Sequence, residues 1–290
     1  KLDLKNNVLR AVDKRIFDKD PLRILRAIRF KAKSSFEIES KTEKLMIENK
    51  EKIMSVAAER VHDEIIKIFS YSNTAKIFKY MQNKINLLYH ARKSIDSVDT
   101  HKILKLIDSY AKRNELIFYI DEDKLPLFKI AVILLELFEE EKKLEEIETL
   151  LKKLRFSNNE ISYLLILLAN YKKIINLFYE DILSKKSIYK IIRVTNQYTF
   201  DTLLFSFFIL LSSSNSKDDF EKRRDYREYI SEFINKYTTI KEKIKEPLIK
   251  GEDIMKTLNI EESPKIGKYI EELKKAQAFD IVNNQKEAVE

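Results

Sequence analysis

The sequence of 290 residues contains no cysteine and only two glycines, Gly251 and Gly267. The absence of cysteine excludes a disulfide framework, a thiolate metal site and a cysteine nucleophile. The absence of glycine before position 251 excludes a glycine-rich phosphate-binding loop from most of the chain. Because there are also only four prolines and little alternation of β-branched residues, the sequence predicts an all-α protein.

Long apolar runs and a large excess of one charge are missing as well. No apolar run approaches the ~20 residues of a membrane span, and the first residues, KLDLKNNV, do not resemble a signal peptide. We therefore expect no membrane partner and a cytoplasmic location. The 55 Lys and Arg residues exceed the 47 Asp and Glu residues by 8, which permits nucleic-acid binding without requiring it.

Residues that could hold a metal ion are few. The three histidines are widely separated in the sequence, and we interpret the His62–Asp63 pair as a surface feature. Two Asp-x-Asp triplets occur, at residues 18–20 and 121–123. Two-metal nucleotidyl transfer needs paired carboxylates, but neither triplet follows a Gly-Ser turn, so we predict no metal site in this chain.

The most informative stretch is FDKDPLRILRAIRF, residues 17–30. Asp20 stands directly before Pro21, which predicts a helix that begins at Pro21 with Asp20 as its N-cap. Leucine and isoleucine recur every third residue and can face a core. The arginines recur at the same interval, at Arg23, Arg26 and Arg29. Because such a row drifts around a helix, we expect Arg29 to point away from the other two.

These arginines have two interpretations. Charged rows usually mark only a solvated helix face with a few ion pairs. The alternative rests on Asp20, which can only accept hydrogen bonds, and Arg23, which can only donate them. Cytosine and adenine present an amino donor beside a ring-nitrogen acceptor, whereas guanine and uracil present the reverse order. A rigid Asp–Arg pair could therefore accept C and A and refuse G and U, as proteins that read exposed bases do.

Two segments carry a resemblance to a known family. DPLRILRAIRF at 20–30 and AAERVHDEIIKIF at 57–69 resemble the neck of class II tRNA nucleotidyltransferases, the CCA-adding enzymes, and of bacterial poly(A) polymerases. The first segment matches their base-selecting motif E-D-x-x-R, which implies that Asp20 and Arg23 pair with the incoming nucleotide and that Arg26 supports them. Lys19 replaces the first acid of that motif. The second segment matches E-R-x-x-x-E, which implies that Glu59, Arg60 and Glu64 stabilise the neck.

The resemblance also implies a domain order. Residues 1–16, with a strand expected at 8–12, are the end of an α/β nucleotidyltransferase head whose earlier part is absent. We expect a helical neck at 17–93, a helical body at 94–211 and a tRNA-binding tail at 212–290, arranged as an elongated array of helices. The best candidate for a loop is SSSNSKDD at 212–219.

The tail is expected to contact RNA. PLIKGEDI at 247–254 and SPKIG at 263–267 resemble the family's tail motifs, with Ser263 in place of a glycine. A charged run such as residues 220–246 is most often a solvated helix face, but its lysines could also bind phosphates. A helix N-terminus at Pro264–Gly267 could do the same. The candidate RNA-binding residues are Lys241, Lys243, Lys245, Lys250, Gly267 and Lys268.

The resemblance implies transfer of CMP and AMP from CTP and ATP to the tRNA 3′ end, with Mg²⁺ held in the missing head. This chain would supply base selection and tRNA binding, and alone it should be inactive. A separate head chain or domain is then a possible partner. Two alternatives stay open: a poly(A) polymerase or an enzyme restricted to CC or A addition, and a non-catalytic helical RNA-binding module.

Overall fold

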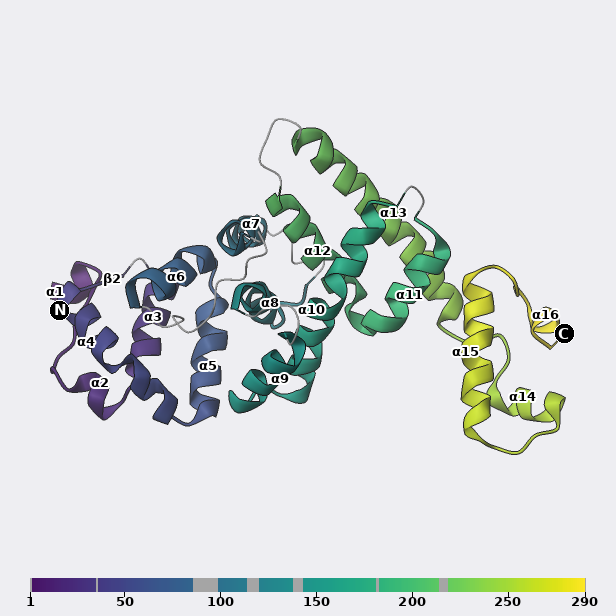
Figure 1. Ribbon diagram of the computed structural model, residues 1–290, viewed down its shortest axis with the longest axis horizontal. Coiled ribbons are helices and arrows are strands. Elements are labelled where there is room, and N and C mark those ends of the chain that lie inside the picture. The colour runs from purple at the N-terminus through teal and green to yellow at the C-terminus, as the bar shows by residue number, and fades with distance from the viewer. Residues whose placement is uncertain are drawn as a thin grey trace. The chain divides into compact units, whose positions relative to one another are not determined.

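The computed structural model describes residues 2–34, 36–85, 99–113, 120–137, 143–180, 183–213 and 219–289 (Figure 1). The structure there is almost entirely helical, which confirms the all-α class. The expected neck–body boundary at residue 93 and most of the expected loop at 212–219 lie outside the described residues.

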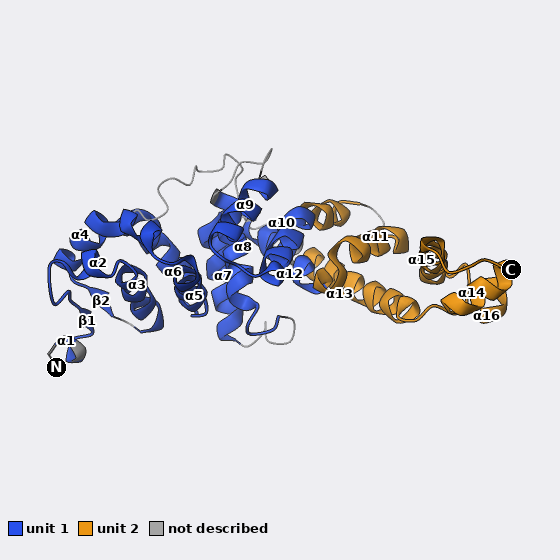
Figure 2. Ribbon diagram, turned by 90° about the horizontal axis from the view of Figure 1, so that it is seen from below, with its two compact units in different colours: residues 1–171, 200–215 blue, residues 172–199, 216–290 orange. Residues whose placement is uncertain are grey.

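The chain folds into two compact units (Figure 2). Unit 1 contains residues 1–171 and 200–215, and unit 2 contains residues 172–199 and 216–290. The division into head remnant, neck, body and tail stays a prediction.

The first half of unit 1 consists of short helices and one pair of strands. In chain order these are α1 (Leu2–Lys5), β1 (Val8–Leu9), α2 (Ile16–Lys19), α3 (Arg23–Lys33), β2 (Glu37–Ile38), α4 (Ser40–Asn49), the 3₁₀ helix η1 (Lys50–Ser55), α5 (Ala58–Phe69), α6 (Thr74–Tyr80) and the π-helical turn η2 (Met81–Ile85). The strands pair in parallel, with Val8 opposite Glu37 and Leu9 opposite Ile38. A strand therefore lies where the sequence indicates one, but it is shorter than expected.

The second half of unit 1 is a helical bundle. Its helices are α7 (Thr100–Lys112), α8 (Leu125–Leu137), α9 (Lys143–Lys153), the first part of α10 (Asn158–Phe178) and nearly all of α12 (Thr199–Ser213). Helix α8 is buried over residues 127–135, and the ring of Phe128 meets Phe205 and Phe208 of α12 edge to face. Such contacts between buried aromatic rings stabilise a core beyond the area that they bury.

Unit 2 holds the end of α10 and the remaining helices. These are α11 (Lys185–Thr195), the 3₁₀ turn η3 (Asn196–Tyr198), α13 (Asp219–Ile244), α14 (Gly251–Leu258), α15 (Pro264–Ala278) and α16 (Gln285–Val289). Buried Gln277 fastens the end of α15 to the end of α13. Its amide donates to the carbonyls of Lys243 and Glu246 and accepts from the backbone N–H of Leu248.

Helix α10 has 21 residues and is apolar enough, by length and composition, to cross a membrane. The sequence predicts no apolar run of that length. Half of its apolar window is buried inside the protein, and the core helix of a soluble protein passes the same test. One such helix is weak evidence of a membrane span.

Candidate functional site

Asp20 lies in the turn between α2 and α3. Helix α2 ends at Lys19, and α3 begins at Arg23 with Leu22 as its N-cap and no side-chain cap. The prediction that Asp20 caps the helix with its side chain was therefore wrong. Its backbone carbonyl accepts the Arg23 N–H at 3.1 Å, so the carboxylate is available for other partners.

Three arginines surround the Asp20 carboxylate. Arg23 Nε donates to Oδ2 at 3.4 Å, Arg26 Nη1 lies 3.8 Å from Oδ2, and Arg60 Nη2 lies 3.7 Å from Oδ1. The side chain of Asp20 is 24% exposed and that of Arg23 is 47% exposed. These long contacts balance the charge but leave polar edges of both side chains open to solvent.

Glu64 of α5 forms a second contact with the arginines of α3, and the two helices pack against each other (Figure 1). Its carboxylate is buried, with Oε2 2.8 Å from Arg29 Nε and Oε1 3.7 Å from Arg26 Nε. The Arg29 N–H does not point at the oxygen, so neither buried atom has a well-aligned hydrogen bond despite the short distance. The attraction is mainly Coulombic.

The sequence does not indicate that Arg29 belongs to this contact. Arg29 was expected to point away from Arg26, but both contact Glu64. Three residues along a helix turn a side chain by only about 60° from alignment. The long arginine side chains span that angle.

The other two residues of the E-R-x-x-x-E motif have different partners. Arg60 reaches Asp20, whereas Glu59 pairs with Arg155 at 3.5 Å, where both side chains are 67% exposed. Of the three charged residues of this motif, only Glu64 is buried between α3 and α5. The roles of Glu59 and Arg60 in stabilising this region stay a prediction.

His62 is half-buried, so its interpretation as a surface residue was wrong. Its Nε2 lies 3.1 Å from Glu160 Oε1 at the start of α10, its Nδ1 lies 3.3 Å from Asp63, and its ring meets Phe156 edge to face. Burial raises the pKa of Glu160, but hydrogen bonds from the Ser157 backbone and hydroxyl, together with His62, outweigh it and lower that pKa. His62 thus ties α5 to α10.

We expect Glu64→Gln to destabilise the protein by about 1–3 kcal/mol, because it removes the charge that balances Arg26 and Arg29 and leaves Arg29 Nε buried without an anion. Urea unfolding monitored by circular dichroism measures this. The matched control, Glu59→Gln, removes an exposed partner and should change stability by less than about 0.5 kcal/mol. Equal effects of the two substitutions would contradict the role assigned to Glu64.

The carboxylates of the described residues do not suit Mg²⁺. No group of three or more His, Asp or Glu side chains gathers there in a way that could hold a metal ion. Within the two Asp-x-Asp triplets, Asp18 binds Lys52, Asp20 faces arginines, and Asp121 lies 2.5 Å from Lys124. Carboxylates already matched by cations are poor ligands for a divalent ion.

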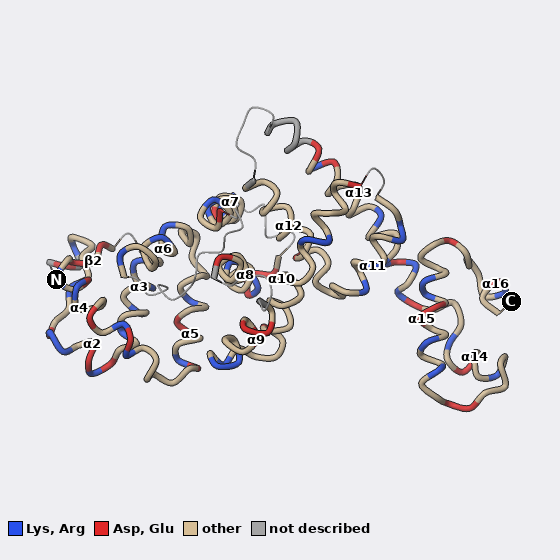
Figure 3. The backbone as a smooth tube through the Cα atoms, in the orientation of Figure 1, with Lys and Arg blue, Asp and Glu red and all other residues tan. Residues whose placement is uncertain are grey.

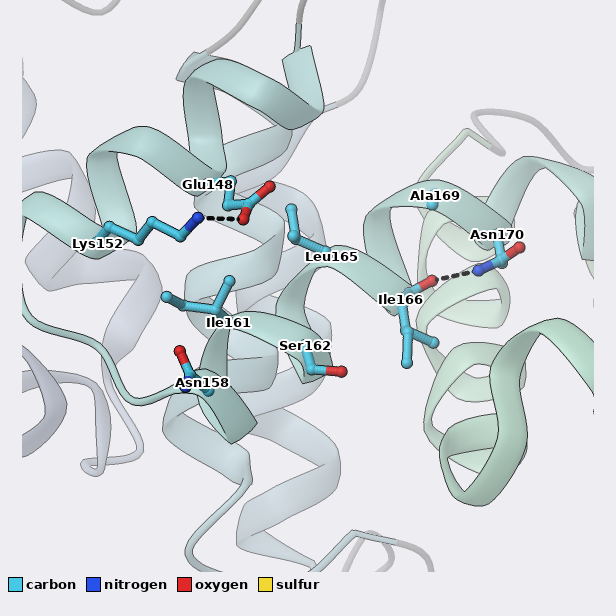
Figure 4. Close-up of a pocket in the computed structure, with 9 residues that line it drawn as sticks. All are labelled: Glu148, Lys152, Asn158, Ile161, Ser162, Leu165, Ile166, Ala169 and Asn170. Atoms are coloured by element: carbon cyan, nitrogen blue, oxygen red, sulfur yellow. Dashed lines mark hydrogen bonds and ion pairs between the residues drawn. The ribbon is translucent and has the colours of Figure 1, made fainter.

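A groove of about 480 Å³ lies between α9 and α10 (Figure 4). Ile161 and Leu165 lie along it, and its two charged residues, Glu148 and Lys152, form an ion pair at 2.6 Å. With its cation neutralised and no aromatic ring in its lining, this groove does not offer what a nucleotide needs.

The predicted RNA-binding residues are spread over several elements of unit 2. Lys241 lies 5.4 Å from the centre of the Tyr237 ring, and Lys245 and Lys250 are exposed near the loop between α13 and α14. Gly267 and Lys268 are exposed in the first turns of α15, where a Cβ at Gly267 would meet nothing within 4 Å.

Lys243 differs from these residues because it is engaged within the protein. Lys243 and Lys185 both bind Asp280, which holds the pKa of that carboxyl at about 2. An RNA phosphate would have to compete with Asp280 for Lys243.

Comparison with known families covers most of the chain. Residues 35–90 match the family model described as the probable RNA and SrmB-binding site of polymerase A. Residues 130–290, more than half of the chain, match the model for tRNA nucleotidyltransferase domain 2. The resemblance identified from the sequence is therefore confirmed.

Individual relatives match only in part. The CCA-adding enzyme of Lactobacillus helveticus is 41% identical over 69 residues, which are 23% of this chain and 17% of that enzyme. The CC-adding tRNA nucleotidyltransferase of Geobacter sulfurreducens is 41% identical over 66 residues, 23% of this chain and 15% of that enzyme.

Among solved structures, that of the Thermotoga maritima CCA-adding enzyme complexed with tRNA shares the fold, with a TM-score of 0.60 at 18% identity over 99% of this chain. This chain covers 64% of that one, so it spans less than two thirds of the protein whose fold it shares. The matches over residues 35–90 and 130–290 place the chain in the tRNA nucleotidyltransferase family.

Proposed function

We propose that this chain supplies the base-selecting and RNA-binding parts of an enzyme that adds CMP and AMP, from CTP and ATP, to the 3′ end of tRNA. Its membership of the tRNA nucleotidyltransferase family supports this proposal. So do the names of curated relatives, which are CCA-adding or CC-adding enzymes. A cytoplasmic location is part of the proposal, because the proposed substrate, tRNA, is found there.

The observation that carries the proposal is the pairing of Asp20 with Arg23 at the start of α3. Asp20 can accept the exocyclic amino group of cytosine or adenine, while Arg23 donates to the adjacent ring nitrogen. Guanine and uracil would place a carbonyl against the carboxylate and an N–H against the guanidinium. Two like groups would then face each other, which leaves both unpaired at the cost of about 1–3 kcal/mol each.

The surrounding charges position this pair. Arg26 lies between Asp20 and Glu64, within 3.8 Å of both carboxylates. Glu64 in turn is fixed by its burial and by Arg29. A recognition pair has to be held within about 0.5 Å of its working geometry. The connected ion pairs of Asp20, Arg26, Glu64 and Arg29 restrict the movement of Asp20. Lys19, in place of the family's first acid, instead pairs with Asp13 at 3.0 Å.

In the proposed reaction, the tRNA 3′ hydroxyl attacks the α-phosphate of the nucleotide and pyrophosphate leaves. Mg²⁺ would supply the charge stabilisation for this step. The described residues do not fit Mg²⁺, so its ligands are assigned to a catalytic head. The residues of this chain would bind and orient the base.

The test joins this chain to the head of a class II enzyme and offers CTP, ATP, GTP and UTP with tRNA that lacks its 3′ end. We expect addition of C and A only. Asp20→Asn replaces one acceptor oxygen with a donor, and we expect it to reduce discrimination against U and G by about 10- to 100-fold. Arg23→Lys keeps the charge but loses the fixed fork of donors, and we expect a similar loss.

The matched control is Asp13→Asn, which removes an exposed carboxylate near Asp20 that pairs with Lys19. It should leave the order of nucleotide preference unchanged. If Asp20→Asn and Arg23→Lys behaved like Asp13→Asn, base selection would not lie in this pair, and a non-catalytic RNA-binding module would become the better proposal.

A second candidate is an enzyme restricted to CC addition or to poly(A) synthesis. The match of residues 35–90 to a polymerase A region favours it, as does the CC-adding relative. The products of the same assay separate the candidates, because they end in CCA, in CC or in a run of A.

A further inference from the structure

A groove of about 470 Å³ in unit 2 has a basic rim and an apolar floor. It lies between the end of α10, helix α11 and the end of α15. Its lining residues are Lys173, Lys186, Tyr189, Lys190, Ile191, Arg193, Val194, Lys275 and Phe279. None of the residues predicted from the sequence to bind RNA is among them.

The rim takes three of its charges from one face of α11. Lys186, Lys190 and Arg193 stand at positions i, i+4 and i+7, which share one side of a helix, and the basic residues of α11 are visible in Figure 3. Arg193 is engaged by Glu271 of α15, at 2.8 Å and 3.2 Å. This two-point ion pair fixes α11 against α15 and lowers the pKa of Glu271.

Lys186 and Lys190 are both exposed, and within the described part of the chain neither side chain has an ion pair or hydrogen bond. Lys275, across the groove, pairs with Glu272 of its own helix at 2.9 Å. Two uncompensated cations therefore stand one helical turn apart, about 6 Å along the axis. That spacing allows each to contact a different phosphate of one strand.

The floor is built from rings and aliphatic side chains. Tyr189 is buried and meets Phe279 edge to face, with ring centres 5.5 Å apart. Val194 is 45% exposed beside them. A ligand that suits this groove has a flat apolar face close to two negative charges. RNA offers that combination in every nucleotide, because a base lies beside its own phosphate. An acidic peptide has no such flat face at each charge.

We propose that this groove is an RNA-contact site, in which an exposed base lies on the floor of Val194, Tyr189 and Phe279 while Lys186 and Lys190 bind the flanking phosphates. The inference rests on the proposed function for its partner, RNA, and adds where in unit 2 that partner is held. It adds α11 to the elements of unit 2 from which RNA contacts are predicted.

Binding of fluorescently labelled tRNA lacking its 3′ end, measured by anisotropy with the whole chain, tests the two lysines. We expect the double variant Lys186→Gln with Lys190→Gln to raise Kd about 10-fold or more and to reduce the slope of log K against log salt by about 1–2. The matched control, Lys105→Gln with Lys112→Gln, removes two exposed charges from α7 of unit 1 and should change Kd less than about twofold.

The absence of tryptophan from the chain allows a direct test of the floor. Val194→Trp introduces a single tryptophan, which can be excited apart from the tyrosines and should be quenched by an added RNA strand because bases stack on the indole. A control fluorophore, Leu144→Trp in α9 of unit 1, should respond much less. Free CTP and ATP are added separately, because quenching by nucleotide at the affinity of RNA would assign the groove to a free nucleotide.

The outcomes separate the inference from the proposed function. Binding of tRNA that the Lys186 and Lys190 variants weaken no more than the control would overturn the groove assignment and leave base selection by Asp20 and Arg23 untouched. Failure of the unchanged chain to bind tRNA overturns both. Weakened binding of the variants, with quenching at Val194→Trp, supports the groove even if the nucleotide-selection assay fails.

Discussion

Replacement of Lys129 by methionine is expected to destabilise unit 1 by about 3–5 kcal/mol. Lys129 lies in α8 and is fully buried. Asp108 of α7 is almost completely buried. The Lys129 ammonium lies 3.2 Å from Asp108 Oδ1 and donates to the Tyr71 carbonyl at 2.7 Å. Asp108 Oδ2 accepts the backbone N–H of Ala75 at 3.1 Å. One ion pair therefore connects α6, α7 and α8.

The size of the effect follows from what the substitution leaves behind. Burial lowers the pKa of Lys129, and the Asp108 carboxylate opposes that shift. Without Lys129, Asp108 is a buried charge with no cation, and the Tyr71 carbonyl keeps only the donor from the Thr74 hydroxyl. The contact of Lys129 with Oδ1 is close but poorly aligned as a hydrogen bond. Charge balance is therefore the main loss.

Urea unfolding of the unchanged protein, the two single variants and the double variant measures the interaction energy of Lys129 and Asp108. Lys129→Met and Asp108→Asn are each expected to be strongly destabilising, whereas the double variant should recover much of the loss because no buried charge remains. The exposed pair of Lys152 and Glu148 in α9 provides the control, and Lys152→Met should cost less than about 1 kcal/mol. Additive effects of Lys129→Met and Asp108→Asn would contradict the coupling.

The sequence predicts those parts of the fold and site that depend on local spacing. The helical stripe of α5 follows from periodicity, because a helix repeats within a few residues. The burial of α8 follows from a sequence that is apolar nearly all round. The placement of Asp20 beside Arg23 also follows, since three residues bring the two side chains together. Local chemistry was nevertheless ambiguous at Asp20, where the same side chain could cap the helix or face the arginines.

Contacts between distant segments could not be predicted in this way. His62 meets Glu160, 98 residues away, and Lys243 meets Asp280. A carboxylate in a charge-rich sequence has many possible partners, and only the packing of the helices selects one. Lys129 did carry a signal, because it interrupts the apolar run LPLFKIAVILL, where a lysine needs a buried partner. The i, i+4, i+7 spacing of Lys186, Lys190 and Arg193 is also visible in the sequence and predicts that the three residues share one helix face.

Replacement of Asp201 by asparagine is expected to stabilise the protein at neutral pH, by about 1–3 kcal/mol. Asp201 lies in the first turn of α12 and is buried. Burial raises the pKa of its carboxyl to about 6, from the ordinary 3.8, with Lys124 opposing the shift and Asp121 adding to it. The position at a helix N-terminus favours a negative charge, which limits the gain to the lower part of that range.

The pH dependence gives the sign of this effect. Because the folded-state pKa is raised, the folded protein binds the proton more tightly than the unfolded chain. The resulting stability is fully present below pH 3.8 and is lost as the pH rises through about 6. An asparagine side chain does not titrate, so Asp201→Asn should match the original protein near pH 4 and exceed it at pH 7.5. Urea unfolding at several pH values between these limits measures the difference, with Asp225→Asn in α13 as an exposed control. If the stability curve of Asp201→Asn ran parallel to that of the original protein across this range, the buried carboxyl would not be the source of the penalty.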